Sequence, residues 1–299
     1  MDRFHLMNVF VAVAEEEGFA GGARRLGLSP PAVTRAIAAL EHRLGVKLLN
    51  RTTRFVRVTD AGARYLESAR RILSEIDEAD EAAAGSHAAP RGELAVTAPV
   101  LFGSQYVVPG IVDYLGRYPD VSVSALFLDR VVGLLEEGLD VGVRIGELPD
   151  STLRAIPVGF VRRVVCASPR YLKRHGAPRE PGELAGHVVV AASPVSPSVE
   201  WRFGAGKRSV IAKIKPRLSV TSNDAAIRAA LLGFGITRLM SYQVADHLAA
   251  GRLERVLAAQ EPPPLPIHVI HVEGRRASAK VRVFVDLLVD RLRANPALA

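Results

Sequence analysis

Cysteine and long apolar runs are both scarce in this chain of 299 residues. The one cysteine, Cys166, excludes a disulfide within the chain and fits a reducing compartment. No uncharged apolar run approaches the roughly 18 residues that a membrane span needs. The N-terminal stretch lacks the basic segment and the cleavage site of a signal peptide. These absences predict a cytoplasmic protein that does not bind a membrane.

Residues arranged for catalysis or metal binding are also missing. His268 and His271 lie three positions apart in a strand-like run, so they would point to opposite faces and make poor joint metal ligands. The run Gly204–Lys207 matches only part of a phosphate loop and lies between two strand-like runs, where a hairpin turn is the better interpretation. Cys166 lies in an apolar run typical of a buried side chain, and no Gly-x-Ser-x-Gly motif occurs. We therefore expect no catalytic residue, metal site or cofactor, and we expect that this protein is not an enzyme.

The most informative stretch that is present lies between residues 18 and 62. A first helix is indicated over residues 19–26, and the turn Gly27-Leu28-Ser29 follows it. A second helix begins with Ser29 as its N-cap and Pro30 at its first position, where both residue types are favoured. Its apolar residues recur at helical spacing: Val33, Ile37, Leu40 and Leu44. Two helices joined by a short turn with glycine predict a helix-turn-helix motif, whose second helix enters the DNA major groove.

The distribution of charge supports this prediction. Between Gly18 and Arg71 the sequence has eleven basic and three acidic residues, a net charge of +8 that equals the net charge of the whole chain. A basic excess confined to one module is typical of a nucleic-acid-binding surface. The alternative, a solvated basic face on an ordinary helical domain, is disfavoured by the helix-turn-helix pattern.

Further helices are predicted on both sides of this motif. A helix over residues 4–17 is expected to precede the motif. Apolar and polar residues alternate over residues 51–59, which predicts a short two-stranded wing. A long helix then begins at Thr59 or Asp60 and extends to about Ala84. The heptad-like spacing of its apolar residues favours a dimer through this helix over packing on its own domain. These residues are Tyr65, Ala69, Ile72, Ile76, Ala79 and Ala83.

The pattern changes after residues 85–92, which have the small residues, proline and glycine of a linker. Strand-like and helix-like runs then alternate, which indicates helices on a mainly parallel sheet. One such helix is expected over residues 131–137, and residues 199–203 and 208–214 are expected to form a hairpin. About 200 residues are many for one such core, so we expect two α/β subdomains with a cleft.

Short sequence motifs that occur together in one known protein family are spread over nearly the whole chain. In the helix-turn-helix part they are Phe10, Val13, Ala14, Gly18-Phe19, Ala23, Leu26, Ser29, Pro31-Ala32-Val33-Thr34, Ile37, Leu40-Glu41, Leu44-Gly45, Leu48-Leu49, Arg51, Arg54 and Thr59-Asp60-Ala61-Gly62. In the second part they are Thr97-Ala98-Pro99, Tyr118-Pro119-Asp120, Val143-Arg144-Ile145-Gly146, Ser168-Pro169-Arg170-Tyr171-Leu172 and Gly233-Phe234-Gly235-Ile236. With these motifs the chain resembles the LysR-type transcriptional regulators.

Three places depart from the pattern of that family. Pro30 stands where many relatives have glutamine, Gly18–Ala23 differs from their usual Ser-Phe-(Ser/Thr)-x-Ala-Ala, and Met240-Ser241 stands where relatives often have a proline. Because Pro30 removes one side chain that could reach a base edge, the operator preference of relatives cannot be transferred to this chain.

The resemblance implies an N-terminal all-α winged helix-turn-helix domain with a long linker helix, followed by a C-terminal α/β effector domain of periplasmic-binding-protein-like type. The expected boundaries are 1–59 for DNA binding, 60–92 for the linker and dimerisation helix, and 93–299 for the regulatory domain. Within the last, subdomain I is expected at about 93–161 plus 266–299, and subdomain II at about 162–265.

The DNA-binding residues are expected at the start of the second helix of the motif and in the wing. The helix N-terminus and its short hydroxyl side chains favour phosphates, and an arginine there suits a guanine edge or a phosphate. Arginines of the wing would contact sugar-phosphate or the minor groove. The predicted set is Ser29, Pro30, Pro31, Thr34, Arg35, Arg51, Thr53 and Arg54.

The effector site is expected where strands end before helices, because free N–H groups and the helix dipole favour anions there. The family resemblance implies a cleft that often takes a small carboxylate, with Arg144 as its charge partner. Plain capping by Ser222 or Asn223, and a structural ion pair of Arg144, are the alternatives. The predicted set is Thr97, Ala98, Pro99, Val100, Arg144, Ser222, Asn223 and Gly235.

These observations predict a transcriptional regulator whose promoter binding responds to a small anionic effector. Its expected partners are double-stranded promoter DNA, a carboxylate effector, copies of itself in a dimer or tetramer, and RNA polymerase. One alternative is a small-molecule-binding protein or enzyme with an α/β cleft and a helical appendage. Another is a helix-turn-helix protein that senses no ligand.

Overall fold

The computed structural model describes residues 2–51, 56–84, 89–130, 132–148, 153–192, 199–206, 209–272 and 278–298. It contains two compact units, which are described separately. The N-terminal unit comprises Met1–Gly92 with Gly274–Ala279, and the C-terminal unit comprises Glu93–Glu273 with Lys280–Ala299.

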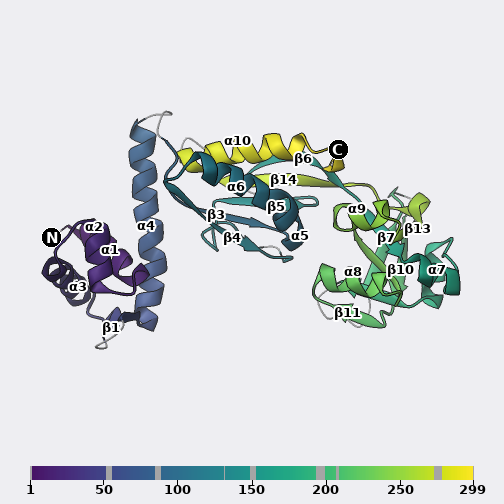
Figure 1. Ribbon diagram of the computed structural model, residues 1–299, viewed down its shortest axis with the longest axis horizontal. Helices are drawn as coiled ribbons and strands as arrows, with labels where there is room; N and C mark the ends of the chain where they lie inside the picture. The colour runs from purple at the N-terminus through teal and green to yellow at the C-terminus, as the bar shows by residue number, and fades with distance from the viewer. Residues whose placement is uncertain are drawn as a thin grey trace. The chain divides into compact units, whose positions relative to one another are not determined.

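The N-terminal unit is a small helical domain with a wing, drawn in purple and blue in Figure 1. Its helices are α1 (Arg3–Glu15), α2 (Phe19–Leu26), α3 (Pro30–Leu44) and the long α4 (Asp60–Ala84). Strands β1 (Leu49–Arg51) and β2 (Val56–Val58) pair antiparallel between α3 and α4.

Local signals end α2 and α3 where the sequence predicts. Gly27 after α2 and Gly45 after α3 have φ angles of 63° and 67°, a left-handed conformation that glycine adopts without steric cost. The side chain of Ser29 caps α3 by accepting from the backbone N–H of Ala32 at 3.4 Å. The predicted helix-turn-helix is therefore confirmed.

One hydrophobic core holds the first three helices and the wing together. Val13 of α1 and Ala23 of α2 are both fully or almost fully buried. Gly22 allows these two helices to approach closely, because a Cβ there would lie only 2.8 Å from Cγ2 of Val13. The core contains Leu6, Val9, Phe10, Val13, Ala23, Val33, Ala36, Ile37, Leu40, Leu48 and Leu49.

The first half of the expected dimer seam packs within the chain instead. Tyr65 of α4 contacts the ring of Phe10 with a centroid distance of 5.5 Å. Ala69 is fully buried in a second cluster with Met7 and Val11 of α1, and Ile72 packs against that cluster. Ala69 is therefore not available to an intermolecular seam, because α1 supplies its apolar partners, whereas Tyr65 and Ile72 are only half-buried and the dimer through α4 stays a prediction. Ile76 lies further along α4, and the side chains of Ala79 and Ala83 lie outside the described residues.

The C-terminal unit is built on two mixed sheets of five described strands each. The first sheet has the order β4-β3-β5-β14-β6 and the second has the order β11-β8-β12-β7-β13. The first contains β3 (Gly92–Ala98), β4 (Val121–Phe127), β5 (Val141–Ile145), β6 (Leu153–Val161) and β14 (Leu265–Val272). The second contains β7 (Arg163–Ala167), β8 (Val189–Ala192), β11 (Leu218–Val220), β12 (Ile236–Met240) and β13 (Glu254–Val256).

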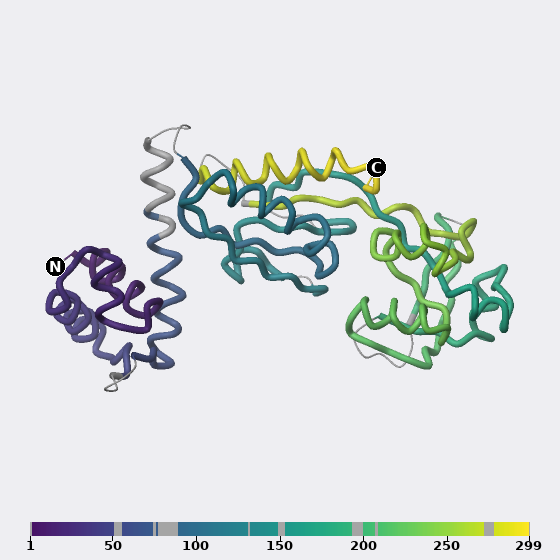
Figure 2. The backbone as a smooth tube through the Cα atoms, in the orientation of Figure 1, coloured from purple at the N-terminus to yellow at the C-terminus, as the bar shows by residue number. Residues whose placement is uncertain are grey.

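The chain passes between these sheets twice, from β6 to β7 and from β13 back to β14, as Figure 2 shows. β14 is antiparallel to β5 and β6, and β7 is antiparallel to β12 and β13. The expectation of a mainly parallel sheet was therefore wrong, since the strands next to each crossing run against their neighbours.

Both faces of the second sheet are buried, with alternate residues of β7 on opposite faces. Val165 and Ala167 pack with Tyr171 of α7 (Pro169–His175) and with the hairpin of β9 (Val199–Phe203) and β10 (Val210–Ile214). Val164 and Cys166 pack with α8 (Asn223–Leu231) and α9 (Ser241–Ala249). Burial raises the pKa of the Cys166 thiol to about 12, which agrees with a buried side chain.

The hairpin of β9 and β10 is confirmed as an antiparallel pair. The helix expected over residues 131–137 was wrong, because the described residues there form turns that end at Gly138 with a φ of 65°. α5 (Val100–Phe102), a π-helical segment (Gly103–Val107) and α6 (Val108–Arg117) follow β3. α10 (Ala279–Arg293) packs on α6 through Phe284 and Tyr114, whose rings lie 5.2 Å apart.

No described helix is both long enough and apolar enough to cross a membrane. Within the described part of the chain, no group of three or more histidine, cysteine, aspartate or glutamate side chains could hold a metal ion.

Candidate DNA interface and ligand cavity

The start of α3 presents side chains to solvent but few backbone donors. Ser29, Pro30 and Pro31 are exposed. Neither proline has a backbone N–H, and the N–H groups of Ala32 and Val33 already donate to the carbonyl oxygen of Ser29. The start of α3 therefore offers few free N–H groups, so the predicted preference for phosphate depends there on side chains and on the helix dipole. The Ser29 Oγ accepts from Ala32, so its proton can still be donated outward.

Thr34 and Arg35 lie one turn further along α3. The Thr34 hydroxyl donates to the carbonyl oxygen of Pro30 at 3.0 Å, so its proton is used within the helix. Arg35 is exposed and makes no ion pair with any described residue. Among the predicted contacts of the wing, Thr53 and Arg54 lie outside the described residues, as does the side chain of Arg51.

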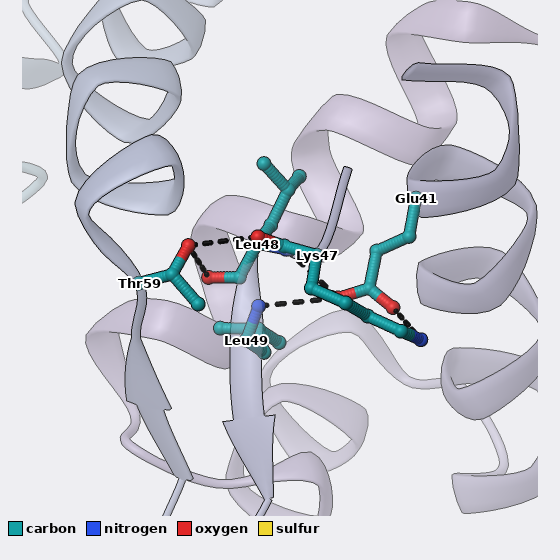
Figure 3. Close-up of polar contacts among 5 residues, drawn as sticks. All are labelled: Glu41, Lys47, Leu48, Leu49 and Thr59. Carbon is teal, nitrogen blue, oxygen red and sulfur yellow. Dashed lines mark hydrogen bonds and ion pairs between the residues drawn. The ribbon is translucent and has the colours of Figure 1, made fainter. Parts of the chain in front are cut away.

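A buried carboxylate fixes the chain after α3 against the first wing strand. Glu41 accepts from the backbone N–H groups of Leu48 at 2.9 Å and Leu49 at 3.1 Å, and it pairs with Nζ of Lys47 at 2.7 Å (Figure 3). Burial raises the pKa of the Glu41 carboxyl, but the hydrogen bonds from Lys47, Leu49 and Leu48 outweigh it and lower the pKa below its usual value. The pattern Leu40-Glu41 thus marks a structural residue.

The hydroxyl of Thr59 ties the other side of the same junction. It donates to the carbonyl oxygen of Lys47 at 2.8 Å (Figure 3). It also accepts from the backbone N–H of Gly62 at 2.9 Å. A Cβ on Gly62 would lie only 2.0 Å from the carbonyl oxygen of Leu48. Glu41, Thr59 and Gly62 therefore set where the wing leaves α3 and where α4 begins.

Part of the positive charge of this unit is neutralised locally. Glu15 of α1 pairs with Arg70 of α4 at 2.8 Å and also with Arg25 of α2. Lys47 pairs with Glu41. The arginines that remain without an ion pair to a described residue, Arg35 among them, are the ones available to a phosphate backbone.

The C-terminal unit contains a cavity of about 420 Å³, within the usual range for small-molecule sites. Its lining comes from both sheets and from the helices that follow them. The lining residues are Pro99, Leu128, Asp129, Arg130, Arg144, Ile145, Arg163, Ala191, Ala192, Trp201, Thr221, Asn223, Arg238, Leu239, Met240, Tyr242 and Gln243.

Three of the eight predicted effector residues line this cavity: Pro99, Arg144 and Asn223. Arg144 is 8% exposed and its Nη2 donates to the carbonyl oxygen of Val132 at 2.7 Å, which leaves other N–H groups of the guanidinium for a ligand. Asn223 donates from Nδ2 to Asp129 at 2.9 Å.

The other predicted residues lie near the cavity without lining it. Thr97 and Ala98 are fully buried in β3, and the N–H of Val100 donates to Asp129 at 3.1 Å. Ser222 caps α8, which matches the alternative reading of this position as a plain cap. Gly235 is pressed against the second sheet, since a Cβ there would lie 2.5 Å from the carbonyl oxygen of Val188. A side chain at this position would therefore require the backbone to shift.

Two models of protein families match the chain. The model described as "Bacterial regulatory helix-turn-helix protein, lysR family" matches residues 4–63, and the one described as "LysR substrate binding domain" matches residues 87–293. The uncharacterised HTH-type transcriptional regulator YhjC of Escherichia coli is 33% identical over 98% of this chain and 99% of its own. The chain belongs to the LysR family of transcriptional regulators.

Solved structures of LysR-type regulators have the same fold. The chain is 33% identical to CrgA of Neisseria meningitidis, with a TM-score of 0.62 over 97% of this chain and 99% of that one. The full-length Vibrio cholerae virulence activator AphB, at 24% identity, has a TM-score of 0.63 over 97% of this chain and 99% of its own. The similarity therefore covers both the N-terminal and the C-terminal unit.

As a LysR family member, the chain is a transcriptional regulator with a DNA-binding domain and an effector-binding domain. Regulators of this family bind promoter DNA and small-molecule effectors, form oligomers, and are not enzymes.

Sequence reasoning missed Arg163 and Arg238, two cavity arginines of this LysR-type regulator. Each lies in a strand, and a lone arginine in a strand does not differ in sequence from a solvated one. The register of β7 against β12, which joins segments far apart in the chain, was needed to find them.

Proposed function

We propose that this regulator reads its operator with the exposed face of α3 and changes its DNA binding when a small anion occupies the cavity. Domain limits of 1–59, 60–92 and 93–299, with the two subdomains as expected from the sequence, describe this division of labour. The observation that supports it best is that one chain contains both features: Arg35 is exposed on α3 without an ion pair to a described residue, and the C-terminal unit has a cavity lined by arginines.

The DNA contacts in this proposal are those predicted from the sequence, with roles refined by the geometry of α3. Arg35 contacts a guanine edge or a phosphate, and Ser29 donates its free proton to a phosphate. Pro30 and Pro31 pack against the DNA backbone and donate no hydrogen bond. The wing residues Arg51, Thr53 and Arg54 and the helix residue Thr34 complete the predicted surface: Ser29, Pro30, Pro31, Thr34, Arg35, Arg51, Thr53 and Arg54.

The assembly and setting are also part of the proposal. A dimer or a dimer of dimers places two or four copies of α3 on half-sites separated by whole turns of DNA. The protein acts in the cytoplasm, and its ligand-dependent rearrangement changes contact with the promoter or with RNA polymerase. The ligand shifts this equilibrium only through its different affinity for the two states.

Binding to the upstream DNA of the protein's own operon tests the DNA side of the proposal. We expect a mobility shift that weakens steeply with salt, because arginines release counterions from phosphates. Arg35→Ala should make the free energy of DNA binding at matched salt less favourable by about 1–3 kcal/mol, the range of one good base contact. Arg117→Ala, which removes the same charge from an exposed end of α6, is the matched control and should leave the affinity unchanged.

A mobility shift that does not depend on DNA sequence would reject sequence-specific reading of this operator by α3. An unchanged affinity of a folded Arg35→Ala variant would remove Arg35 from the interface. Folding of both variants is checked by far-ultraviolet circular dichroism and by thermal unfolding.

A further inference from the structure

Two arginines of the cavity lie on the same face of the second sheet. Arg163 of β7 is paired with Met240 of β12, and Arg238 of β12 is paired with Val165 of β7. Alternate residues of a strand share a face, so Arg163 and Arg238 are diagonal neighbours across these two strands. Like charges so placed repel each other.

No described carboxylate compensates this pair of charges. Among the ion pairs and hydrogen bonds of the described residues, none joins Arg163 or Arg238 to an acidic side chain. Nη1 of Arg238 donates to the carbonyl oxygen of Arg202 at 3.2 Å, and its guanidinium lies 4.9 Å above the ring of Trp201. These contacts hold Arg238 in place and leave its charge unneutralised.

The pKa of Arg238 reflects this environment. Burial, and secondarily the positive charge of Arg163, lower this pKa to about 10. Burial also lowers the pKa of Arg163 and of Arg144. A site that disfavours its own cations in this way is relieved when an anion enters.

The charges of the whole lining indicate how many negative charges would balance it. Four arginines and one aspartate line the cavity. Arg130 is paired with Glu137 at 3.1 Å, whereas the Asp129 carboxylate accepts from the N–H of Val100 and from Nδ2 of Asn223 and makes no ion pair with a described arginine. Arg144 on β5 and Arg163 and Arg238 on the second sheet then give three positive charges against the one negative charge of Asp129, a net charge of +2 carried by both sheets.

We propose that the ligand of this cavity is a small organic dianion with two separate acid groups, one held by Arg163 and Arg238 and the other by Arg144. Guanidinium groups bind carboxylates through paired hydrogen bonds, which suits a dicarboxylate. Apolar side chains on the same face as the two arginines, Trp201 and Met240, also line the cavity and suit a short carbon skeleton between the acid groups. The inference rests on the proposed function and narrows it from an anion to a diacid.

Matched acids with the same carbon skeleton test the proposal by isothermal titration calorimetry. The pairs are succinate with butyrate, adipate with hexanoate, and terephthalate with benzoate, each against the full-length protein. At least one diacid should bind about tenfold or more tightly than its monoacid, because a second charge-assisted contact forms only with the diacid. Inorganic phosphate, a compact anion, should bind more weakly than that diacid.

Arg163→Gln and, independently, Arg238→Gln should each reduce the affinity for the diacid to that for the monoacid. Arg162→Gln is the matched control, since Arg162 is the exposed neighbour in sequence and does not line the cavity, and it should keep the preference. Thermal unfolding of the free protein adds a readout that a structural role would not produce. Arg163→Gln should be at least as stable as the wild type, because it removes a repulsion.

Several results would overturn the proposal. Equal binding of a monoacid and its diacid, or of inorganic phosphate, would reject the two separate acid groups while leaving an anionic effector intact. Binding of none of the six acids at millimolar concentration would reject the diacid class, and a less stable Arg163→Gln would reject the uncompensated pair. The mobility shift with operator DNA does not depend on any of these results, so failure of the regulator assignment is detected separately.

Discussion

At the scale of single residues, the buried carboxylate of Glu41 stabilises the fold of the DNA-binding domain more than the exposed arginines of that domain do. Glu41 is only 5% exposed and its two oxygens accept from two backbone N–H groups and one ammonium. By contrast Lys47, its partner, has an exposed side chain, so the ion pair itself contributes little. The backbone hydrogen bonds to the charged carboxylate carry the stabilisation.

Glu41→Ala should therefore lower the free energy of unfolding of the N-terminal unit by about 1–3 kcal/mol, since two buried N–H groups lose their acceptor. The lowered pKa means that the folded state binds the Glu41 proton less readily than the unfolded chain does. The stabilisation is thus present above the unfolded pKa and is lost as the pH falls through the folded pKa.

Urea unfolding at neutral pH and at a pH below the usual carboxyl range measures both effects. The gap between wild type and Glu41→Ala should narrow in acid. Glu67→Ala on the exposed side of α4 is the control and should change stability little at either pH. A gap that stays constant or widens in acid would show that the carboxylate charge of Glu41 is not stabilising.

At the scale of secondary structure elements, the junction of the wing and α4 depends on a close backbone approach. Gly62→Ala should destabilise the protein by about 1–3 kcal/mol, because the new methyl group overlaps the carbonyl oxygen of Leu48 and forces the backbone to shift. Gly116→Ala in α6 is the matched control. A Cβ there meets no atom within 4 Å, so this variant should be neutral or gain up to about 1 kcal/mol from helix propensity.

Thermal and urea unfolding of the two glycine variants give the comparison. A Gly62→Ala protein as stable as wild type would mean that the β1–α4 junction relaxes without cost. Opposite signs for the two substitutions would separate the steric effect at the junction from the general effect of glycine on an unfolded chain.

The elements that sequence predicted best are those with local stop signals. Gly27, Ser29 and Pro30 lie within a few positions of the ends that they mark, so α2 and α3 follow from sequence alone. The seam of α4 was predicted wrongly at Ala69, because apolar residues at this spacing pack equally well against a helix of the same chain, and α1 covers Ala69. The hairpin of β9 and β10 was predictable because its strands are adjacent in sequence.

The cavity could be predicted only in part for the same physical reason. Arg144 follows from the family motif that contains it. Arg163 and Arg238 come together through the pairing of β7 with β12, and neither strand contains a local signal for that register. Thr97 and Gly235 lie in matching motifs and are buried, and neither lines the cavity, so the motifs alone did not identify the lining residues.

At the scale of the whole molecule, regulation requires that the ligand cavity and the DNA-binding surface influence each other. If a bound diacid changes the affinity for operator DNA by some factor, operator DNA must change the affinity for the diacid by the same factor. This reciprocity holds for any mechanism that connects the two units. It is therefore a test of regulation that needs no knowledge of how the units are arranged.

We expect the two factors to agree and to lie at about 5- to 150-fold, the usual range of coupling between sites. Fluorescence anisotropy of the upstream DNA with and without the diacid gives one factor, and calorimetry of the diacid with and without that DNA gives the other. Arg163→Gln should keep the DNA affinity of the ligand-free protein and lose the response to the diacid. If both factors equal one while the diacid still binds, the cavity holds a ligand that does not regulate DNA binding, because a ligand with equal affinity for two states cannot shift their populations.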